Sequence, residues 1–480
     1  MTNLWTADEI LKATGGVLKD SGDWSTKRLI MDSREAQKGD IFIALEGEAG
    51  TEKYRTSGLD GHDFVSSAIN NGAIAVIVDH EINVSIPQII VENTFKAMQD
   101  LGQFARTRAN LETSIAITGS VGKTTVRDMV ETAFRGAEAV THASVKSYNN
   151  MIGVPYTLAN MSADTEVGVF EIGMNHADEI TPLSHQVRPD IAMITWIAAQ
   201  HIENFDNGMG GIVDAKSEIF KGMDDKGMAI LPIDNDYYDD LVRNTHDNGV
   251  QKIYTFGKHQ DADARLISTI NDNGAMRVEA NIMGEEVSYD LHVMGDHMAV
   301  NSLSALLAVK LSGCDAQMAA KALSQIQPLQ GRGTIEQITI IDGQPPVTLI
   351  DDSYNAAPVA VEMALRNLGQ MTPQGKGRRI AMIGRMAELG DYAEAEHKNL
   401  AKPFLESDID LIYCCGADSQ YLYNEVPVHH QGMITETSLD LASHIHDIVQ
   451  PGDIVLVKGS LGSKMGVVVK TIRALNQSEK

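Results

Sequence analysis

The chain has 480 residues, which at roughly 150 residues per domain suggests about three domains. Acidic residues (65) outnumber basic ones (39), and the net charge of −26 argues against a nucleic-acid face or an anionic membrane surface as a partner, because both bind through clustered cations. Only three cysteines, a start without a signal-peptide pattern and no stretch near 18 apolar residues argue against a disulfide framework, a structural zinc site and a membrane span, so a reducing cytoplasmic location is expected.

Short apolar runs bounded by turn residues predict strands along the whole chain. In the first hundred residues these runs include Asp40–Leu45 and Ile74–Val78, and no glycine-rich loop accompanies them. Further on, strands alternate with helical patterns, which is typical of buried parallel strands in βαβ units. One group of strands covers Ser114–Thr118, Val167–Ile172, Asp190–Thr195 and Gly227–Leu231, and a later group covers Val347–Ile350, Arg379–Ile383, Asp410–Cys414 and Asp453–Val457.

A helix at about Asp296–Leu311 and a polar Gln-Gly-Arg-Gly segment separate the two strand groups. The sequence therefore predicts an α/β protein with three domains, at residues 1–109, 110–313 and 314–480.

The strongest local motif is a loop that follows the Ser114–Thr118 strand and opens an amphipathic helix. Glycines there let the backbone amides turn toward phosphate oxygens, and the helix N-terminus adds its positive end. Lys123 can reach the β- and γ-phosphates and Thr124 can hold Mg²⁺. Position 117 is Ile, so this is a shortened phosphate loop that predicts ATP or GTP binding; its residues are Gly119, Ser120, Val121, Gly122, Lys123, Thr124 and Thr125.

The loop and a dozen other motifs, in order along nearly the whole chain, resemble the Mur ligases, the ATP-dependent amide-forming enzymes of peptidoglycan precursor synthesis. Three of the motifs, YNNMIGVP, DDSYNAAP and MAELG, are most similar to the member that adds D-alanyl-D-alanine to UDP-N-acetylmuramoyl-tripeptide. The others are DSR, GDIFIAL and DGHDF near the start, EIGMNHADEI, QHIENF, DAKSEIF, GDHMAVN, GRG and VKGS.

The resemblance implies three domains: a UDP-sugar-binding N-terminal domain, a central P-loop-type ATPase domain with a mostly parallel sheet, and a C-terminal Rossmann-like domain. It implies that the peptide carboxylate attacks the γ-phosphate of ATP to give an acyl phosphate, which the amine of the dipeptide then displaces. ATP and Mg²⁺ are the expected cofactors, UDP-N-acetylmuramoyl-tripeptide and D-alanyl-D-alanine the expected substrates, and a monomer the expected state.

Three further residues resemble the family's metal-binding and catalytic groups. Glu171 ends a predicted strand and His201 follows another, and both match ligands of the second Mg²⁺; the alternatives are a solvated surface residue and a buried, hydrogen-bonded histidine. Lys216 matches a lysine that the family carbamylates, which would turn a cation into an anion facing metal ions. On its own, a lysine on a helix is normally a surface charge.

The remaining site predictions carry alternatives too. Asn149, near the metal and the acyl phosphate, and Asn150 could instead form a turn before a helix, Asn175 could be a helix cap, and Arg34 could form a structural salt bridge. The ATP-binding predictions include Asn301, Arg332 and Asp352, the last of which would contact the ribose or orient Arg332. The substrate-binding predictions are Ser33, Arg34, Asn150, Asn175, His176, Tyr354, Asn355 and Lys458.

Four positions depart from the family pattern: Met298, Ala357, Arg385 and Leu461. Three of them lie in the C-terminal domain, which helps choose the incoming amine. Two alternatives therefore stay open: a Mur-type ligase with a different donor or acceptor, and a nucleotide-binding protein without ligation. The sequence leaves residue three of the tripeptide, diaminopimelate or lysine, undetermined.

Overall fold

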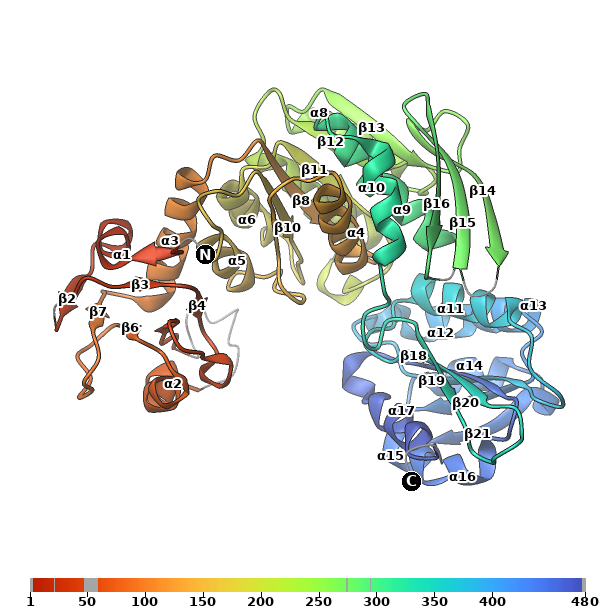
Figure 1. The fold of residues 1–480 in the computed structure, drawn as a ribbon. Coiled ribbons are helices and arrows are strands. Elements are labelled where there is room, and N and C mark those ends of the chain that lie inside the picture. Colours follow the sequence, from red (N-terminus) through yellow and green to blue (C-terminus); the bar gives the residue numbers. More distant parts are fainter. Residues whose placement is uncertain (1–2, 21, 47–58, 273–274, 294, 477–480) are drawn as a thin grey trace.

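The computed structural model describes residues 3–20, 22–46, 59–272, 275–293 and 295–476, and three α/β bodies follow one another in chain order (Figure 1). In the N-terminal body a five-stranded sheet has the order β2-β7-β6-β5-β4, parallel except for the β2–β7 pair. Its strands are β2 (Val17–Lys19), β4 (Leu29–Ile30), β5 (Ile41–Ile43), β6 (Ala75–Val78) and β7 (Gln88–Ile90), with a small pair β1 (Trp5–Thr6) and β3 (Ser25–Thr26); its helices are α1 (Ala7–Thr14), α2 (Val65–Asn71) and α3 (Thr94–Arg108).

The central body is built on a nine-stranded sheet of order β16-β15-β14-β13-β12-β11-β8-β10-β9. Strands β8 to β14 pair in parallel, and β14, β15 and β16 form antiparallel hairpins. The strands are β8 (Thr113–Thr118), β9 (Thr141–Ala143), β10 (Val167–Glu171), β11 (Ile191–Ile194), β12 (Met228–Pro232), β13 (Lys252–Gly257), β14 (Ala264–Asp272), β15 (Ala275–Ile282) and β16 (Glu285–Leu291).

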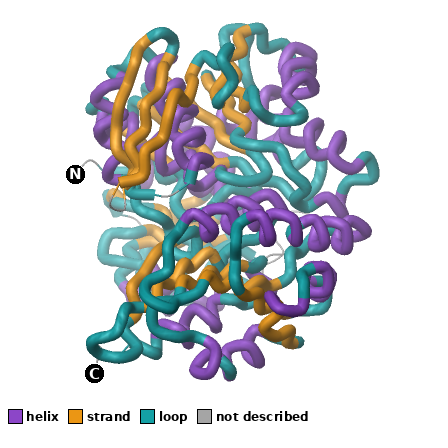
Figure 2. The backbone as a smooth tube through the Cα atoms, turned by 90° about the vertical axis from the view of Figure 1, so that its right-hand side faces the viewer, coloured by secondary structure: helices purple, strands orange, loops and turns teal. Residues whose placement is uncertain are grey.

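Alternating side chains of the central strands separate two apolar cores. Ile115 and Ile117 of β8 join the core that includes residues of α4 (Lys123–Gly136), α9 (Asp296–Leu311) and α10 (Ala316–Ala322), whereas Ala116 joins the core on the opposite face. Helices therefore cover both faces. Figure 2 shows helices and strands together along the molecule, turned by 90° from Figure 1. The helices associated with the second face are α5 (Gly153–Ala159), α6 (Ile180–Val187), α7 (Gly208–Ser217) and α8 (Tyr238–Asp247).

The C-terminal body is a six-stranded sheet of order β17-β18-β22-β19-β20-β21, parallel except for the β17–β18 pair. Its strands are β17 (Thr334–Ile338), β18 (Val347–Asp352), β19 (Arg379–Gly384), β20 (Leu411–Cys415), β21 (Gln431–Thr435) and β22 (Ile454–Lys458). Its helices are α11 (Pro358–Gln370), α12 (Ala393–Asn399), α13 (Ala401–Glu406), α14 (Ser419–Glu425), α15 (Ser438–Ser443), α16 (Ile445–Ile448) and α17 (Gly466–Arg473).

Most sequence-predicted elements are present with small shifts at their ends. The predicted helix at Asp296–Leu311 coincides with α9, and all the apolar runs named above contain strands. The antiparallel hairpins β14–β16 and the edge strand β17 were not predicted. The α/β class and the mostly parallel sheets are confirmed. Helix α10, just beyond the predicted boundary at residue 313, packs on α4: a Cβ at Gly136 would lie 2.3 Å from the Cβ of Ala322.

Specific contacts join the three bodies. Trp5 of the N-terminal body donates its indole N–H to the Ala159 carbonyl oxygen (2.8 Å) at the end of α5. On the other side, one continuous apolar core includes Ile202 and Phe205 of the central body together with Met386 and Leu389 of the C-terminal body. Among the described helices, none is both long and apolar enough to cross a membrane.

Candidate active site

The phosphate loop connects the end of β8 to the start of α4. Gly119 has φ +150°, and a Cβ there would lie 2.0 Å from Thr195 Oγ1, so only glycine lets the loop pass this close to the end of β11. Thr195 Oγ1 donates to the Val121 carbonyl oxygen (2.6 Å), and the Ser120 amide donates to the Trp196 carbonyl oxygen (2.7 Å). The segment after β11 therefore fixes the shape of the loop.

Lys123 lies over this loop at the N-terminus of α4. Its Nζ donates to the carbonyl oxygens of Gly119 (2.6 Å) and Ser120 (3.1 Å). Burial lowers the pKa of Lys123 to about 8, with Glu171 opposing that shift and Arg332 adding to it. The ammonium group is thus charged at neutral pH, and its desolvation favours the approach of an anion such as a phosphate.

Glu171, at the end of β10, faces the first turn of α4. Its Oε1 accepts hydrogen bonds from Thr124 Oγ1 (3.2 Å) and Asn149 Nδ2 (2.7 Å). Its Oε2 is buried and has no hydrogen-bond partner among the described residues. A buried carboxylate oxygen without a partner, beside a threonine hydroxyl, fits the oxygen ligands that Mg²⁺ prefers.

Arg332 comes from the segment before β17 and approaches the same place. Its Nη2 donates to Ser147 Oγ (3.2 Å), and this hydroxyl lies 3.4 Å from Thr124 Oγ1. The guanidinium group stacks over the Tyr354 ring with its Cζ 4.5 Å from the ring centroid. The structure therefore brings the predicted residues Arg332 and Tyr354 to the phosphate loop from beyond the central sheet.

Asn301 of α9 also lies against the phosphate loop. A Cβ placed on Gly122 would be 3.4 Å from Asn301 Nδ2, so α9 and the loop are in close approach. Thr125, in the first turn of α4, makes no side-chain hydrogen bond that links it to the other predicted residues in the described part of the chain.

His201 lies in the loop after β11, in a left-handed backbone conformation (φ +59°). Its Nδ1 contacts the carboxylate of Glu388, a residue of the MAELG motif in the C-terminal body. Within the described contacts nothing joins His201 to Glu171, but β10 and β11 flank β8 in parallel, so both residues lie at the same edge of the sheet.

Lys216 is buried near the end of α7. Burial holds the pKa of its amine well below the ordinary value, and Lys123 lowers it further. The surface-charge alternative for Lys216 is therefore wrong: its exposed fraction is 2%. A neutral amine is the form that reacts with carbon dioxide, so the environment suits the predicted carbamate.

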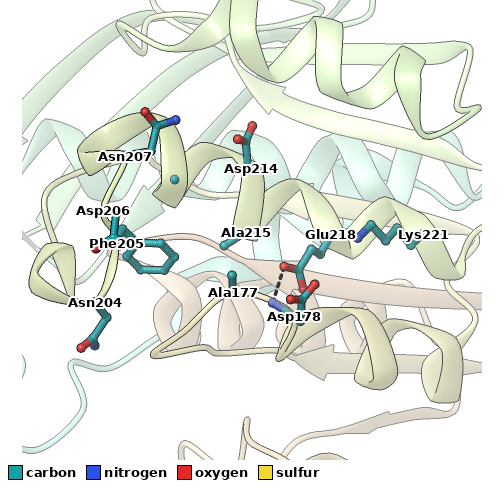
Figure 3. A pocket seen from close by; sticks show the side chains of 11 residues that line it. Ala177, Asp178, Asn204, Phe205, Asp206, Asn207, Asp214, Ala215, Glu218 and Lys221 are labelled. Carbon is teal, nitrogen blue, oxygen red and sulfur yellow. Dashed lines mark hydrogen bonds between the residues drawn. The ribbon is translucent and has the colours of Figure 1, made fainter.

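A polar cavity of about 450 Å³ lies beside α7 (Figure 3). None of the predicted site residues lines it. Figure 3 shows Asp214, Glu218 and Lys221 along one wall and Phe205 across from them. Glu218 accepts a hydrogen bond from the Asp178 amide (2.6 Å) and two more from the first turn of α6. Glu218 is thus a helix cap.

The asparagine predictions have local structural partners. Asn150 Oδ1 accepts from the amides of Ile152 (3.1 Å) and Gly153 (2.9 Å), which is the turn given above as its alternative. The backbone N–H of Asn175 donates to the Glu179 carboxylate (2.8 Å), and His176 Nδ1 contacts the same carboxylate (2.9 Å).

In the C-terminal body Lys458 is held by neighbouring residues. Its Nζ donates to Asp352 Oδ2 (2.7 Å) and to the Asn355 carbonyl oxygen (3.0 Å), while burial raises the pKa of Asp352 against the opposing effect of Lys458. The structure thus brings together three predicted residues, and Asp352 pairs with Lys458 without a hydrogen bond to Arg332.

The two predicted residues of the N-terminal body lie apart from this centre. Ser33 is buried, and Arg34 is largely exposed and pairs with Asp32 (2.6 Å), the salt bridge given as its alternative. Glu35, next in the chain, forms an ion pair with Lys146 (2.6 Å) of the central body. This pair connects the DSR motif to the VKSYNN segment that carries Ser147 and Asn149.

Sequence reasoning missed several residues at the site. Ser147, Glu388 and Lys146 make the contacts described above, yet none was singled out. All three lie within or next to motifs that resemble the Mur ligases (VKSYNN and MAELG), so motif membership was the available signal.

Comparison with known proteins places these contacts in a family context. Residues 117–309 match the Mur ligase middle domain, and residues 338–461 match the family described as Mur ligase, glutamate ligase domain. The UDP-N-acetylmuramoyl-tripeptide–D-alanyl-D-alanine ligase of Rickettsia prowazekii is 31% identical, covering 97% of this chain and 99% of the relative, and that of Bacillus subtilis is 29% identical, covering 92% of each. The crystal structure of MurF from Acinetobacter baumannii superposes with a TM-score of 0.81 at 27% identity, covering 98% of this chain and 99% of that one.

Proposed function

The chain belongs to the Mur ligase family, and on that premise we propose how its residues carry out the reaction. It is an ATP-dependent ligase that adds D-alanyl-D-alanine to UDP-N-acetylmuramoyl-tripeptide and forms a C–N bond in peptidoglycan precursor synthesis. The observation that carries the residue assignment is the buried Glu171 carboxylate, with one oxygen free, opposite the phosphate loop.

The residues around the phosphate loop bind different parts of ATP. Backbone amides of residues 119–122 and the N-terminus of α4 bind the phosphates, and Lys123 neutralises the β- and γ-phosphates. Arg332 approaches from the other side with a planar fork that suits phosphate oxygens. We assign Asn301 to the nucleotide because it lies beside Gly122.

The reaction proceeds in two steps. A carboxylate oxygen of the tripeptide attacks the γ-phosphorus, and the bond to the ADP oxygen breaks. The dipeptide amine then attacks the acyl carbon, the C–O bond to phosphate breaks, and the amine proton passes to solvent. We assign Asn149, whose Nδ2 donates to Glu171 Oε1, to a hydrogen bond with the acyl phosphate.

We assign the binding of Mg²⁺ to Thr124, Glu171, His201 and a carbamylated Lys216. The ion offsets the repulsion between carboxylate and phosphate when it is bound. Support comes from the unpartnered Glu171 oxygen and the buried Lys216 amine, whose pKa burial lowers. Glu171→Gln should lower kcat by about 10²- to 10³-fold, the scale for losing one preorganised charged group, with folding intact. Wild-type turnover in Glu171→Gln would contradict the assignment.

The Lys216 carbamate has its own test. Incubation with ¹³C-labelled bicarbonate should give one carbamate carbon signal in the wild type that is absent from Lys216→Arg. Lys216→Ala should lose activity and recover part of it with added short carboxylates. Full activity of Lys216→Ala would end the carbamate proposal.

We assign substrate contacts to Ser33, Arg34, Asn150, Asn175, His176, Tyr354, Asn355 and Lys458 on family resemblance. Lys458 would exchange its bond to Asp352 for the substrate carboxylate. A cytoplasmic monomer that binds no nucleic acid completes the proposal, and sedimentation velocity tests the monomer.

Phosphate release tests the function as a whole. Sustained ATP turnover should require both the UDP-tripeptide and D-alanyl-D-alanine. A panel with lysine or diaminopimelate at position three and with other dipeptides should identify the natural pair. Turnover that ignores both substrates would contradict ligase activity.

A further inference from the structure

Two histidines and an aspartate, none of them assigned a role above, meet at the edge of the N-terminal sheet where its parallel strands end, the edge at which Ser33 and Arg34 follow β4. Asp79 and His80 directly follow β6, and His62 lies in the 3-10 helix of the DGHDF motif (Gly61–Phe64). One nitrogen from each histidine and one oxygen of Asp79 all lie within 4.8 Å of one another. The ligase reaction gives this cluster no role.

The separations suit a four-coordinate ion. Asp79 Oδ1 lies 3.2 Å from His62 Nε2 and 2.5 Å from His80 Nδ1. Tetrahedral zinc with bonds of about 2.0–2.1 Å separates neighbouring ligand atoms by about 3.3 Å. The first separation already fits, and the second requires a shift of under about 1 Å by His80, whose side chain is 63% exposed.

A neighbouring carboxylate orients His62 for this role. Asp60 Oδ1 lies 2.6 Å from His62 Nδ1 and also accepts the His62 backbone amide (2.9 Å). An N–H at Nδ1 leaves a lone pair on Nε2, and the Asp79 amide points at that atom (3.4 Å). A carboxylate behind a ligating histidine is the usual outer partner of a metal site.

Glu46 adds a second carboxylate on the other side of Asp79. The side chain of Glu46 hydrogen-bonds that of Asp79. No lysine or arginine in the described part of the chain forms an ion pair with Glu46, Asp79 or either histidine. A dication in this place would offset the negative charge that the two carboxylates bring together.

We propose that His62, Asp79 and His80 bind a divalent transition-metal ion of the Zn²⁺ class, with Glu46 as a fourth ligand. Mixed imidazole and carboxylate ligands favour such an ion over Mg²⁺, which prefers oxygen ligands throughout. The ion joins the chain after β5, the DGHDF segment and the chain after β6. The site is independent of the proposed ligase chemistry.

The test is a titration of tag-free, full-length protein with Co²⁺ and Zn²⁺, followed by visible absorption and calorimetry. All variants carry Glu171→Gln, which separates this site from the ATP-linked metal. We expect the Glu171→Gln protein to bind one equivalent of metal ion. Binding should be lost, or at least tenfold weaker, when His80→Asn or Asp79→Asn is added. Asp60→Asn should weaken binding about 10- to 100-fold by releasing the His62 ring.

His429→Asn is the matched control, because His429 lies beside a second histidine, His430, with the ring centroids 4.2 Å apart, and neither forms an ion pair with a carboxylate among the described residues. The His429→Asn variant should bind the metal ion as tightly as the Glu171→Gln protein, the parent of all these variants. Absence of binding in the parent, or equal binding in His80→Asn, would overturn the proposal. His80 is exposed enough that its variant should fold even if Asp79→Asn does not, and thermal unfolding in chelator verifies this.

Discussion

His297 is a titratable residue whose environment affects stability without a place in the chemistry. It lies at the start of α9, and burial lowers the pKa of its imidazole to about 4, with Lys458 adding to the shift and Asp296 opposing it. In the unfolded chain the pKa is about 6.5. Between these values the unfolded state binds more protons, so stability falls as the pH decreases through this window.

We therefore expect His297→Asn to flatten the pH dependence of stability. The wild type should lose about 2–3 kcal/mol more than the variant between pH 7 and pH 4. Urea unfolding at a series of pH values measures this difference. Parallel curves for the two proteins would show that His297 is not the group responsible, and His429→Asn serves as the exposed control.

At the residue scale, sequence patterns predict the element at whose end a side chain lies, but they do not predict its contacts. Glu171 at a strand end and Thr124 after a phosphate loop follow from strand and loop patterns, and the structure places them 3.2 Å apart. The Asp352–Lys458 pair joins strands far apart in sequence, and the contact of His201 with Glu388 crosses between bodies. No periodicity encodes such pairs.

At the element scale, the phosphate loop depends on one close approach. Gly119→Ala places a methyl group against Thr195 Oγ1, which itself holds the Val121 carbonyl oxygen, so the loop must move. We expect at least about 2 kcal/mol of destabilisation and a loss of nucleotide affinity.

Gly249→Ala is the matched control for this prediction. Gly249 also has positive φ (+88°), but nothing lies within 4 Å of a Cβ there. That variant should lose about 1–2 kcal/mol through backbone strain alone and keep full nucleotide affinity. Equal affinity of both variants for ATP, measured by calorimetry, would contradict the steric argument.

Elements differed in how readily the sequence revealed them. Parallel strands buried on both faces are continuous apolar runs, such as β8 and β22, and these were found. The hairpins β14–β16 have one buried face: Met276, Val278 and Ala280 of β15 are buried and alternate with more exposed residues. That alternation was the signal that could have revealed them, but it is weaker than a continuous run.

At the scale of the whole molecule, the C-terminal body docks on the central body through the MAELG segment. Glu388 contacts His201, and Gly390 lies so close to Glu203 that a Cβ there would be 2.8 Å from the Glu203 Cβ. These contacts link the position of the C-terminal body to a predicted metal ligand.

Glu388→Ala should weaken the contact between the central and C-terminal bodies. We expect kcat to fall about tenfold and ATP affinity to fall less, because the phosphate loop stays intact while Arg332 comes from the C-terminal side. Small-angle scattering should show a larger radius of gyration. Glu394→Ala on α12, which removes an exposed ion pair with Lys398, is the control and should match the wild type. A variant as compact and active as the wild type would contradict a role for Glu388 in closure.

The net charge of −26 bears on how the enzyme captures its substrates. ATP and a UDP-linked peptide are both anionic, so the long-range field repels them, and capture depends on local groups such as Lys123, Arg332 and the loop amides. Moderate salt shortens the range of the repulsion to about 10 Å at 0.1 M but screens buried contacts less.

We therefore expect the KM for the UDP-tripeptide to fall as salt rises from low ionic strength, with Mg²⁺ held constant. Steady-state kinetics across a salt series measures this, and a KM that climbs from the lowest salt onward would show that attraction, not repulsion, dominates the approach.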